Sequence, residues 1–435
     1  MNEVLVLTVG GSPQPLRSAI EARAWDRVIF IVSDGSDGKE SSRPNVEDPE
    51  IDYDKKKGLR GPGLRHVPAC PKDIAIMPVP PDDLDRALAL TDQVLAGVLK
   101  QGAAVTVNYT GGTKTMTVAL VLAASAREGV RIEFMAGERP DLVRVRDGTE
   151  KPVEMPGHLL GLANLFSLAR AEVKRRAYGA ALAVVGQIEQ GLRDAAGGPT
   201  KPPQGWRSRA SAWAEWLRLL DAWDRFDVSG AWDRLGTAQQ SNAQWAAALA
   251  QVDADRLKAL ADERKAGAGP LLCEDLWLNA LRRADLGLYD DAIARLYRLA
   301  EAAVQARLRL CHDIPDTGAV PVARLPAALR AGCKVKPDRR TGAVVAELPL
   351  FRALELLAHL DPADPLVAVW PRDGNRFATP DWQAARNRSI LAHGFRPATR
   401  ADWDGAKAWF DDRRAALWET LLDRPTAPQL PDSLP

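Results

Sequence analysis

The 435-residue sequence has few of the residues that build metal sites and disulfide frameworks. Its four cysteines are widely spaced with no Cys-x-x-Cys pair, and its five histidines show no His-Glu-x-x-His spacing. No apolar run approaches the ~18 residues of a membrane-spanning helix. Residues 1–13 lack the basic region of a secretory signal and lead straight into glycines. These absences predict a cytoplasmic protein without metal, cofactor or membrane partner.

The sequence also has almost no net charge. Lys plus Arg number 58 and Asp plus Glu 57, which leaves +1 at neutral pH. No overall field therefore draws the protein to nucleic acid, and an RNA partner needs a local basic patch. Two segments have an excess of basic residues: 331–345, with Lys334, Lys336, Arg339 and Arg340 against Asp338, and 381–400, with Arg386, Arg388, Arg396 and Arg400 against Asp381.

The chain changes character near residue 150, and its length allows two to four domains. Before that point, short β-branched runs at 4–9, 28–32, 73–79, 104–108 and 131–135 alternate with helical patterns at about 14–24, 82–100 and 114–128. Such alternation predicts an α/β domain with a mostly parallel sheet that helices cover on both faces. The polar segment 36–72, with five prolines, is expected to be a surface excursion rather than core.

Beyond residue 156 the apolar spacing is helical and strands nearly vanish. Helices are predicted at 159–169, 177–192, 208–226, 275–310, 348–360, 381–393 and 400–422. Six tryptophans lie in the middle region: Trp206, Trp213, Trp216, Trp223, Trp232 and Trp245. Helix–helix packing is the expected role of this aromatic stripe, and a stacking platform for bases is the alternative. The proline-rich segment 425–435 is expected to be frayed.

Two glycine turns follow strands of the predicted sheet and carry candidate ligand-binding residues. The first contains Gly10, Gly11 and Ser12, and the second contains Asn108, Thr110, Gly111, Gly112, Thr113 and Lys114. The first is not a G-x-G-x-x-G sequence, and the second does not have the phosphate-loop spacing. Both offer backbone donors and hydroxyls at the carboxyl edge of parallel strands, where α/β sheets bind ligands. An anionic or nucleotide ligand is expected, with plain turn chemistry as the alternative.

A third motif lies in the helical part. Arg386 and His393 stand seven residues apart, almost two helical turns, so one face is expected to hold both about 10 Å apart, with Gly394 ending the helix. A histidine can move the proton of a ribose 2′-hydroxyl, and an arginine can hold the charge at the phosphorus centre. Asn387 is placed to orient either group. The alternative is a surface arginine with a capping histidine.

These residues carry a resemblance to a known family. The two glycine turns resemble the CARF domain, the Rossmann-like sensor of type III CRISPR defence, and Arg386-Asn387 with His393-Gly394 resembles the HEPN ribonuclease motif. Residues 279–309 are similar to the helix that opens the catalytic module of that group. The resemblance implies a Rossmann-like sensor at 1–150, an all-α connector at 151–270 and an all-α HEPN domain at 271–435.

The same resemblance implies a function. CARF–HEPN proteins are homodimers in which a cyclic oligoadenylate binds the sensors and switches on metal-independent cleavage of single-stranded RNA. Arg386, Asn387 and His393 would then be catalytic, and both glycine turns would line the ring. A ring of four adenylates is expected rather than six, because the sensor is small. Two alternatives stay open: a sensor or scaffold without nuclease activity, and an enzyme that cleaves the cyclic ligand.

Overall fold

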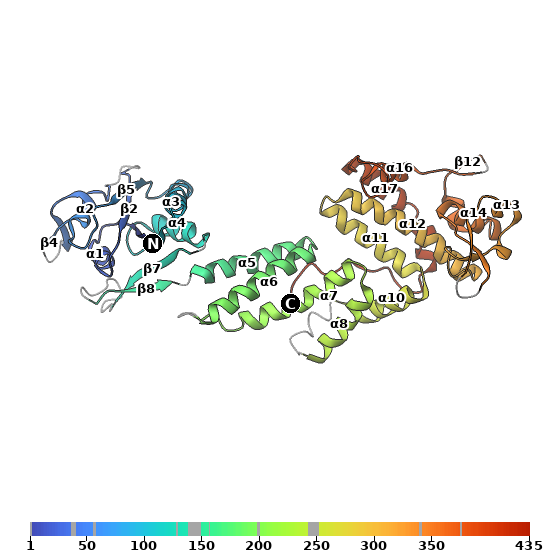
Figure 1. Cartoon of the computed structure of the whole chain (residues 1–435), viewed down its shortest axis with the longest axis horizontal. Helices are drawn as coiled ribbons and strands as arrows, with labels where there is room; N and C mark the ends of the chain where they lie inside the picture. Colours follow the sequence, from blue (N-terminus) through green and yellow to red (C-terminus); the bar gives the residue numbers. More distant parts are fainter. Residues whose placement is uncertain are drawn as a thin grey trace. The chain divides into compact units, whose positions relative to one another are not determined.

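The computed structural model describes residues 2–35, 41–54, 58–127, 129–137, 149–155, 157–197, 201–241, 252–338, 342–374 and 376–435. Trp245, Arg339 and Arg340, which the sequence singled out, lie outside the described residues. The chain divides into two units (Figure 1): Met1–Leu165 with Gln190–Gln204, and Phe166–Glu189 with Gly205–Pro435.

The first unit is built on a six-stranded sheet in the order β5-β2-β1-β6-β7-β8. Five parallel strands form most of it: β1 (Glu3–Thr8), β2 (Arg27–Ser33), β5 (Ile74–Val79), β6 (Ala104–Asn108) and β7 (Arg131–Ala136). The last strand, β8 (Lys151–Met155), pairs antiparallel with β7 and was not predicted. The mostly parallel sheet expected from the five apolar runs is confirmed.

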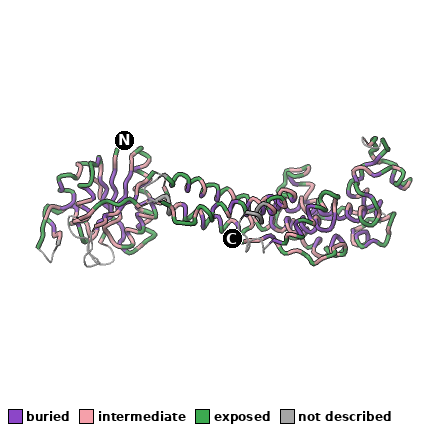
Figure 2. The backbone as a smooth tube through the Cα atoms, turned by 90° about the horizontal axis from the view of Figure 1, so that it is seen from below, coloured by how far each residue is buried: buried purple, intermediate pink, exposed green. Residues whose placement is uncertain are grey.

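Helices cover both faces of this sheet because its central strands are apolar on both sides. Val4 and Val6 of β1 belong to the core beneath α3 (Leu84–Lys100) and α4 (Lys114–Ser125). Leu5 and Leu7 of the same strand belong to the core beneath α1 (Gln14–Glu21). The buried strands appear purple in Figure 2.

The segment after β2 contributes to the core, so the expected surface excursion over 36–72 is wrong in part. It forms α2 (Pro44–Glu47), the hairpin of β3 (Ile51–Asp54) and β4 (Leu59–Gly61), and a 3-10 turn, η2 (Leu64–His66). Val46, Leu64 and Val67 are buried in the core beneath α1. Three isolated apolar residues among prolines and charged residues give no periodic pattern in the sequence. Each of them nevertheless packs into this core.

The rest of the chain is mainly helical, as predicted. Its helices are α5 (Gly157–Lys174), α6 (Tyr178–Asp194), η3 (Ala195–Gly197), α7 (Trp206–Asp224), α8 (Val228–Ser241), α10 (Ala254–Ala266), α11 (Pro270–Asp285), α12 (Tyr289–His312), η5 (Val322–Arg324), α13 (Ala327–Arg330), α14 (Leu350–Leu360), α15 (Pro365–Val369), α16 (Asp381–Arg388), α17 (Arg400–Asp411), α18 (Arg414–Leu417) and η6 (Glu419–Leu421). Trp213, Trp216 and Trp223 of α7 are buried, which confirms the packing interpretation for these three.

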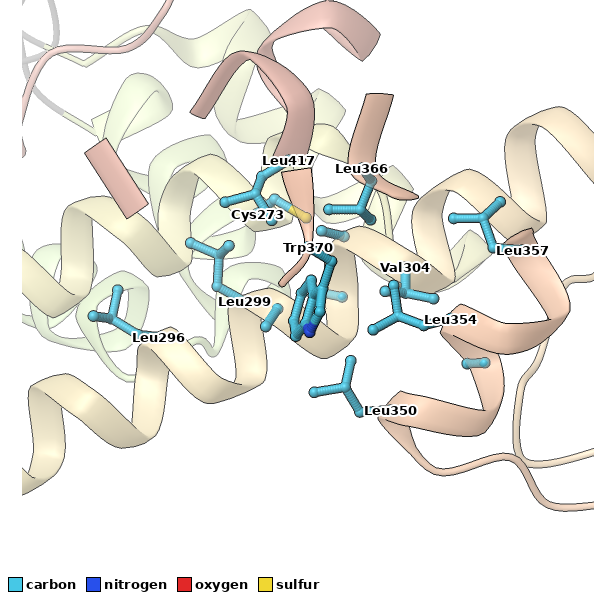
Figure 3. Packing of buried hydrophobic residues seen from close by; sticks show 14 of the residues in the cluster. Cys273, Leu296, Leu299, Val304, Leu350, Leu354, Leu357, Leu366, Trp370 and Leu417 are labelled. Carbon is cyan, nitrogen blue, oxygen red and sulfur yellow. The ribbon is translucent and has the colours of Figure 1, made fainter. Parts of the chain in front are cut away.

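Helix α12 is the centre of the second unit, and α11, α14, α16 and α17 pack against it. Figure 3 shows Val304 of α12 beside Leu354 of α14, with the indole of Trp370 close to both. All of these side chains are almost completely buried.

Two details of the expected all-α region are wrong. A three-stranded sheet of β9 (Val320–Pro321), β10 (Val335–Pro337) and β11 (Val344–Ala346) and a hairpin of β12 (Arg372–Asp373) and β13 (Arg376–Phe377) interrupt the helices. Five prolines between 315 and 349 prevent a long helix there. Segment 425–435 is not frayed either, because hydrogen bonds hold it against the helices of the second unit.

Candidate functional site

The two glycine turns lie in direct contact. Strands β1 and β6 are parallel neighbours, so both turns leave the sheet at the same edge. The Thr8 hydroxyl donates a hydrogen bond to the Gly111 carbonyl at 2.5 Å. A Cβ on Gly10 would lie 2.6 Å from the backbone nitrogen of Gly112, and Gly112 has φ +91°. The pair of turns therefore needs glycine at both positions, one for the close approach and one for its left-handed backbone.

A cavity of about 530 Å³ opens beside the turns. Its lining from the turns, β1 and α4 is Val9, Gly10, Gly11, Gly112, Thr113 and Met116. The opposite wall consists of Ser33 and of residues from the segment after β2: Ser41, Ser42, Pro44, Asn45, Asp48, Glu50, Ile51, Asp52 and Arg60. Sequence reasoning missed this second wall. The available clue was that segment 36–72 directly follows a parallel strand that ends at the same edge of the sheet.

The predicted ligand-binding residues fall into three groups. Gly10, Gly11, Gly112 and Thr113 line the cavity, whereas Ser12 and Lys114 are exposed and Gly111 packs beneath the turn, where its Cβ would meet the Thr8 carbonyl oxygen. The remaining two, Asn108 and Thr110, lie on the inner side of the turn.

The ligand contact predicted for Asn108 does not agree with its geometry, because its side chain is fully buried. Its amide donates to Glu133 at 3.3 Å, and its carbonyl oxygen accepts from the main-chain N–H and the hydroxyl of Thr110. The Thr110 hydroxyl in turn accepts from the main-chain N–H of Met135. Asn108 and Thr110 therefore hold the shape of the second turn from inside.

The two walls of the cavity have opposite hydrogen-bonding character. On the glycine side, within the described residues, no hydrogen bond is recorded for the main-chain N–H groups of Gly11, Ser12 and Gly112, and α1 and α4 both begin there. Such donors suit an anion. On the other side, Glu50 and Asp52 both pair with Arg60, at 3.1 and 3.2 Å, and Asp48 adds a third carboxylate. That wall suits hydroxyl or amino donors of a ligand.

The third motif is arranged differently from the expectation. Helix α16 ends at Arg388, and Ser389 already has extended backbone angles, so the predicted helix through His393 is wrong. The loop after it folds back on the helix end: the main-chain N–H of His393 donates to the Asn387 carbonyl at 3.4 Å, and that of Arg396 to the Arg388 carbonyl at 2.9 Å. A non-helical loop therefore brings the main chain of His393 back to Asn387, where the sequence predicted a continuous helix.

Gly394 makes this fold-back possible. A Cβ at this position would lie 2.2 Å from the Arg388 carbonyl oxygen, closer than real atoms approach. His393 itself is exposed, and no side-chain hydrogen bond is recorded for it in the portion of the chain that the structure describes. Its imidazole is therefore open to a ligand or a partner.

Arg386 is held in place from two sides. Its guanidinium lies over the Tyr297 ring, 4.3 Å from the centroid, and one of its Nη atoms donates to the side-chain oxygen of Asn387 at 3.1 Å. Burial raises the pKa of Tyr297, so the ring stays a neutral phenol beside the cation. Asn387 thus orients the arginine, one of the two roles that the sequence suggested for it.

The loop that carries His393 also exposes large apolar side chains. Ile390, Leu391 and Phe395 are 69%, 47% and 91% exposed, although they lie in the same loop as His393. Among the described residues, no three His, Cys, Asp or Glu side chains gather where they would hold a metal ion. No described helix is long and apolar enough to cross a membrane.

Comparisons with known proteins identify one part of the chain. Residues 261–412, which include Arg386, Asn387 and His393, match the family model described as the Csm6 HEPN domain. No curated protein sequence matches the chain.

Solved structures that are similar to the chain include two with bound cyclic nucleotides. Csm6 of Enterococcus italicus, bound to cyclic hexa-2′-fluoro-hexa-dAMP, is 11% identical over 97% of this chain and 96% of its own, with a TM-score of 0.45. Can2 from Sulfobacillus thermosulfidooxidans, in complex with cyclic tetra-adenylate, is 17% identical over 31% of this chain and 30% of its own, with a TM-score of 0.23.

Proposed function

We propose that the chain is a ribonuclease of type III CRISPR defence controlled by a cyclic oligoadenylate, because residues 261–412, with Arg386 and His393 among them, match the family model of the Csm6 HEPN domain. The observation that carries this proposal is the family match over the very segment in which a turn returns His393 to the end of the Arg386 helix. The proposed substrate is single-stranded RNA, cut without a metal ion.

The chemistry follows from the residues of the motif. The ribose 2′-oxygen attacks the adjacent phosphorus, and the 5′-oxygen of the next nucleotide leaves, which gives a 2′,3′-cyclic phosphate and a 5′-hydroxyl end. One group must take the 2′-hydroxyl proton and another must protonate the leaving oxygen. His393 is the proton-handling group, and Arg386, held by Asn387 and Tyr297, offers its cation to the phosphate oxygens.

A single chain offers only one such histidine, so we propose a homodimer with a composite site. Two-fold pairing brings the second His393 to the same phosphate. The exposed Ile390, Leu391 and Phe395 support a contact at this loop, since burying a phenylalanine side chain contributes about 1.5–3 kcal/mol. Phe395→Ser should give a monomer that does not cut RNA, whereas Leu360→Ser, at an exposed leucine of α14 outside this loop, should stay dimeric. Sedimentation decides, and a fully active monomer contradicts the composite site.

In the α/β domain, the proposed ligand site is the 530 Å³ cavity. Its size lies within the usual range of small-molecule sites, ~300–1,000 Å³. The glycine turns and exposed Lys114 suit the phosphates of the ligand, and the carboxylates of the far wall suit ribose hydroxyls and adenine amino groups. Two copies around a two-fold axis match a ring with an even number of adenylates, and we favour four over six because the domain is small. Lys114→Ala should weaken binding in calorimetry and Lys100→Ala should not, and equal affinities contradict this site.

The nuclease assignment has a direct test. His393→Ala should lower the rate of cleavage of a fluorescent single-stranded RNA by roughly 10²- to 10⁴-fold. His359→Ala, at an exposed histidine of α14, should cut like the wild type. A chelator such as EDTA should not inhibit, and the products should carry 2′,3′-cyclic phosphates. Wild-type cleavage by the His393 variant contradicts the assignment.

A further inference from the structure

Segment 425–435, hereafter the strap, lies in a groove lined by hydrogen-bond donors. Four of its eleven residues are proline, at 425, 428, 431 and 435. Five main-chain oxygens of the strap accept from side chains. Arg176 Nε, in the turn between α5 and α6, donates to Leu430 at 2.8 Å, and Tyr178 hydroxyl donates to Pro431 at 2.7 Å. On α7, Trp216 Nε1 donates to Ser433 at 3.3 Å and Trp213 Nε1 to Pro435 at 3.0 Å, and Arg256 Nη1 of α10 donates to Pro425 at 3.4 Å.

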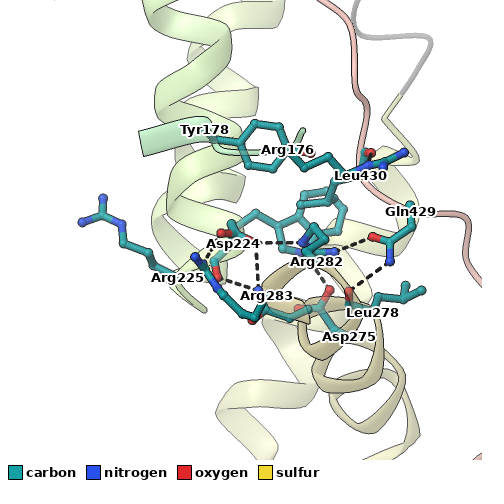
Figure 4. A network of polar contacts seen from close by, with 12 residues as sticks. Arg176, Tyr178, Asp224, Arg225, Asp275, Leu278, Arg282, Arg283, Gln429 and Leu430 are labelled. Carbon is teal, nitrogen blue, oxygen red and sulfur yellow. Dashed lines mark hydrogen bonds and ion pairs between the residues drawn. The ribbon is translucent and has the colours of Figure 1, made fainter. Parts of the chain in front are cut away.

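The other half of the strap is bonded to α11. Glu274 accepts from the main-chain N–H of Ala427 at 2.8 Å. The Gln429 side chain accepts from Arg282 at 2.9 Å and donates to the Leu278 carbonyl at 3.0 Å, as Figure 4 shows. Helix α11 lies within the segment that matches the HEPN family, whereas Tyr178, Trp213 and Trp216 lie before it, on α6 and α7. One short segment is therefore bonded to both parts.

This groove has the chemistry of a site for a proline-rich extended peptide. Proline has no N–H, so such a peptide presents mostly carbonyl acceptors, and its stiff backbone loses little entropy on docking. Indole N–H and phenol O–H donors on an aromatic surface are the matching partner. Every donor on the α6–α7 side is of this kind or is an arginine.

The strap also continues a buried ion cluster between α7 and α11. Arg282 uses Nε to donate to Asp224 of α7 at 2.7 Å, and the same guanidinium reaches Gln429. Asp224 further accepts from Asn279 at 2.8 Å. Arg282 and Asp224 are 1% and 5% exposed, so neither charge is screened by solvent. The contact of the strap is thus linked to the joint between these two helices.

The strap is held by polar contacts and adds little to the apolar core. Only Leu430 is buried, at 7% exposure, and the other strap residues are half-buried or exposed. Two of its partners, Tyr178 and Trp216, are almost completely buried, and Asp432 of the strap pairs with Lys174 and Arg176 at 3.7 and 3.5 Å. No residue of the strap belongs to the core cluster around α12.

We propose that the strap is an intramolecular proline-rich ligand that fastens α6 and α7 to the HEPN domain, and that stimulation of RNA cleavage by the ring depends on this fastening. The second clause rests on the proposed function. A ligand shifts an equilibrium only through an element that has different contacts in the two states. The proposal assigns this part to the strap, because its carbonyls and Gln429 join both parts at once.

The groove assignment is tested with the strap supplied as a peptide. A chain lacking residues 425–435 should bind a fluorescent PTAPQLPDSLP peptide saturably and a scrambled peptide at least tenfold more weakly. Tyr178→Phe, which removes only the hydroxyl that bonds Pro431, should weaken peptide binding severalfold. Equal binding of the two peptides overturns the assignment.

The proposed role of the strap in stimulation is tested in the full-length chain. This test does not depend on whether the truncated chain folds. Tyr178→Phe combined with Gln429→Leu should leave basal cleavage and ring affinity unchanged and reduce the stimulation by the ring at least tenfold. Thr426→Ala, at an exposed strap residue with no recorded contact, is the matched control. Unchanged stimulation, or basal rate and melting temperature falling together, overturns the regulatory role. A wild-type chain that no ring stimulates removes the proposed function, and peptide binding then still decides the groove.

Discussion

Replacing either of two adjacent glycines by alanine tests whether the contact between the two glycine turns builds the ligand site. Gly10 and Gly11 stand side by side in the first turn, and neither has a left-handed backbone. A Cβ on Gly10 would lie 2.6 Å from the nitrogen of Gly112 and 3.1 Å from its Cα, whereas a Cβ on Gly11 meets nothing within 4 Å. Gly10→Ala therefore disturbs the contact of the two turns, and Gly11→Ala does not.

The magnitude follows from the contact distance. Carbon atoms pack at about 3.5 Å, so the turns must separate by roughly 0.9 Å from the 2.6 Å approach. Overpacking of this kind lowers the stability of the folded domain by about 1–3 kcal/mol. If the displaced turn also loses one hydrogen bond to a charged phosphate, the free energy of ligand binding weakens by ~1.5–3 kcal/mol, which is roughly ten- to hundredfold in affinity.

Calorimetry with a cyclic oligoadenylate measures this difference. Gly10→Ala should bind at least tenfold more weakly than the wild type, Gly11→Ala should bind within about twofold of it, and both should retain basal RNA cleavage. Equal affinities for the two variants refute the argument that contact of the turns builds the ligand site.

Three further outcomes are expected. Gly394→Ala should lower RNA cleavage at least tenfold with ring affinity unchanged, because its Cβ would displace the loop of His393 from the Arg388 carbonyl; kinetics and calorimetry on one preparation check this. Asp224→Ala should lower the free energy of unfolding by about 3–5 kcal/mol in urea denaturation, since it leaves buried Arg282 without its carboxylate. Burial raises the pKa of Asp275 to about 6. The contribution of its protonated carboxyl to the free energy of unfolding is therefore present below pH 4 and is lost as the pH rises through 6. Asp275→Asn should remove this pH dependence, which amounts to up to about 3 kcal/mol, in the same urea denaturation measured over a pH series.

The sheet and its edge were predictable because their information is local. Each apolar run between 4 and 135 became a parallel strand, and a glycine turn after a buried strand indicates where main-chain donors gather. The far wall of the cavity was not predictable, since Asp48, Glu50 and Asp52 reach it through a hairpin whose position depends on the burial of Val46 and Leu64. Asn108 illustrates the same limit. The sequence places a polar residue beside a glycine turn, but it does not show whether the side chain faces the cavity or, as here, Glu133.

The helical part shows a second kind of limit. Spacing predicted that Arg386 and His393 share a helix face. Instead, Ser389 leaves helical geometry, and the turn before Gly394 brings the main chain of His393 back to the carbonyl of Asn387. The identities of the motif residues were sufficient to indicate the HEPN model that residues 261–412 match, whereas the arrangement of these residues required the structure. The strap was missed because proline content predicts the absence of a helix, and a groove of indole and phenol donors on distant helices is invisible in a linear sequence.

The most direct test of the central claim is RNA cleavage by the wild-type chain as a function of the concentration of cyclic adenylate rings of three, four, five and six units. The account predicts at least a tenfold rise in cleavage with an even-numbered ring, the four-membered one being favoured, and no rise with His393→Ala. Cleavage that no ring changes, or a rise that His393→Ala retains, contradicts it.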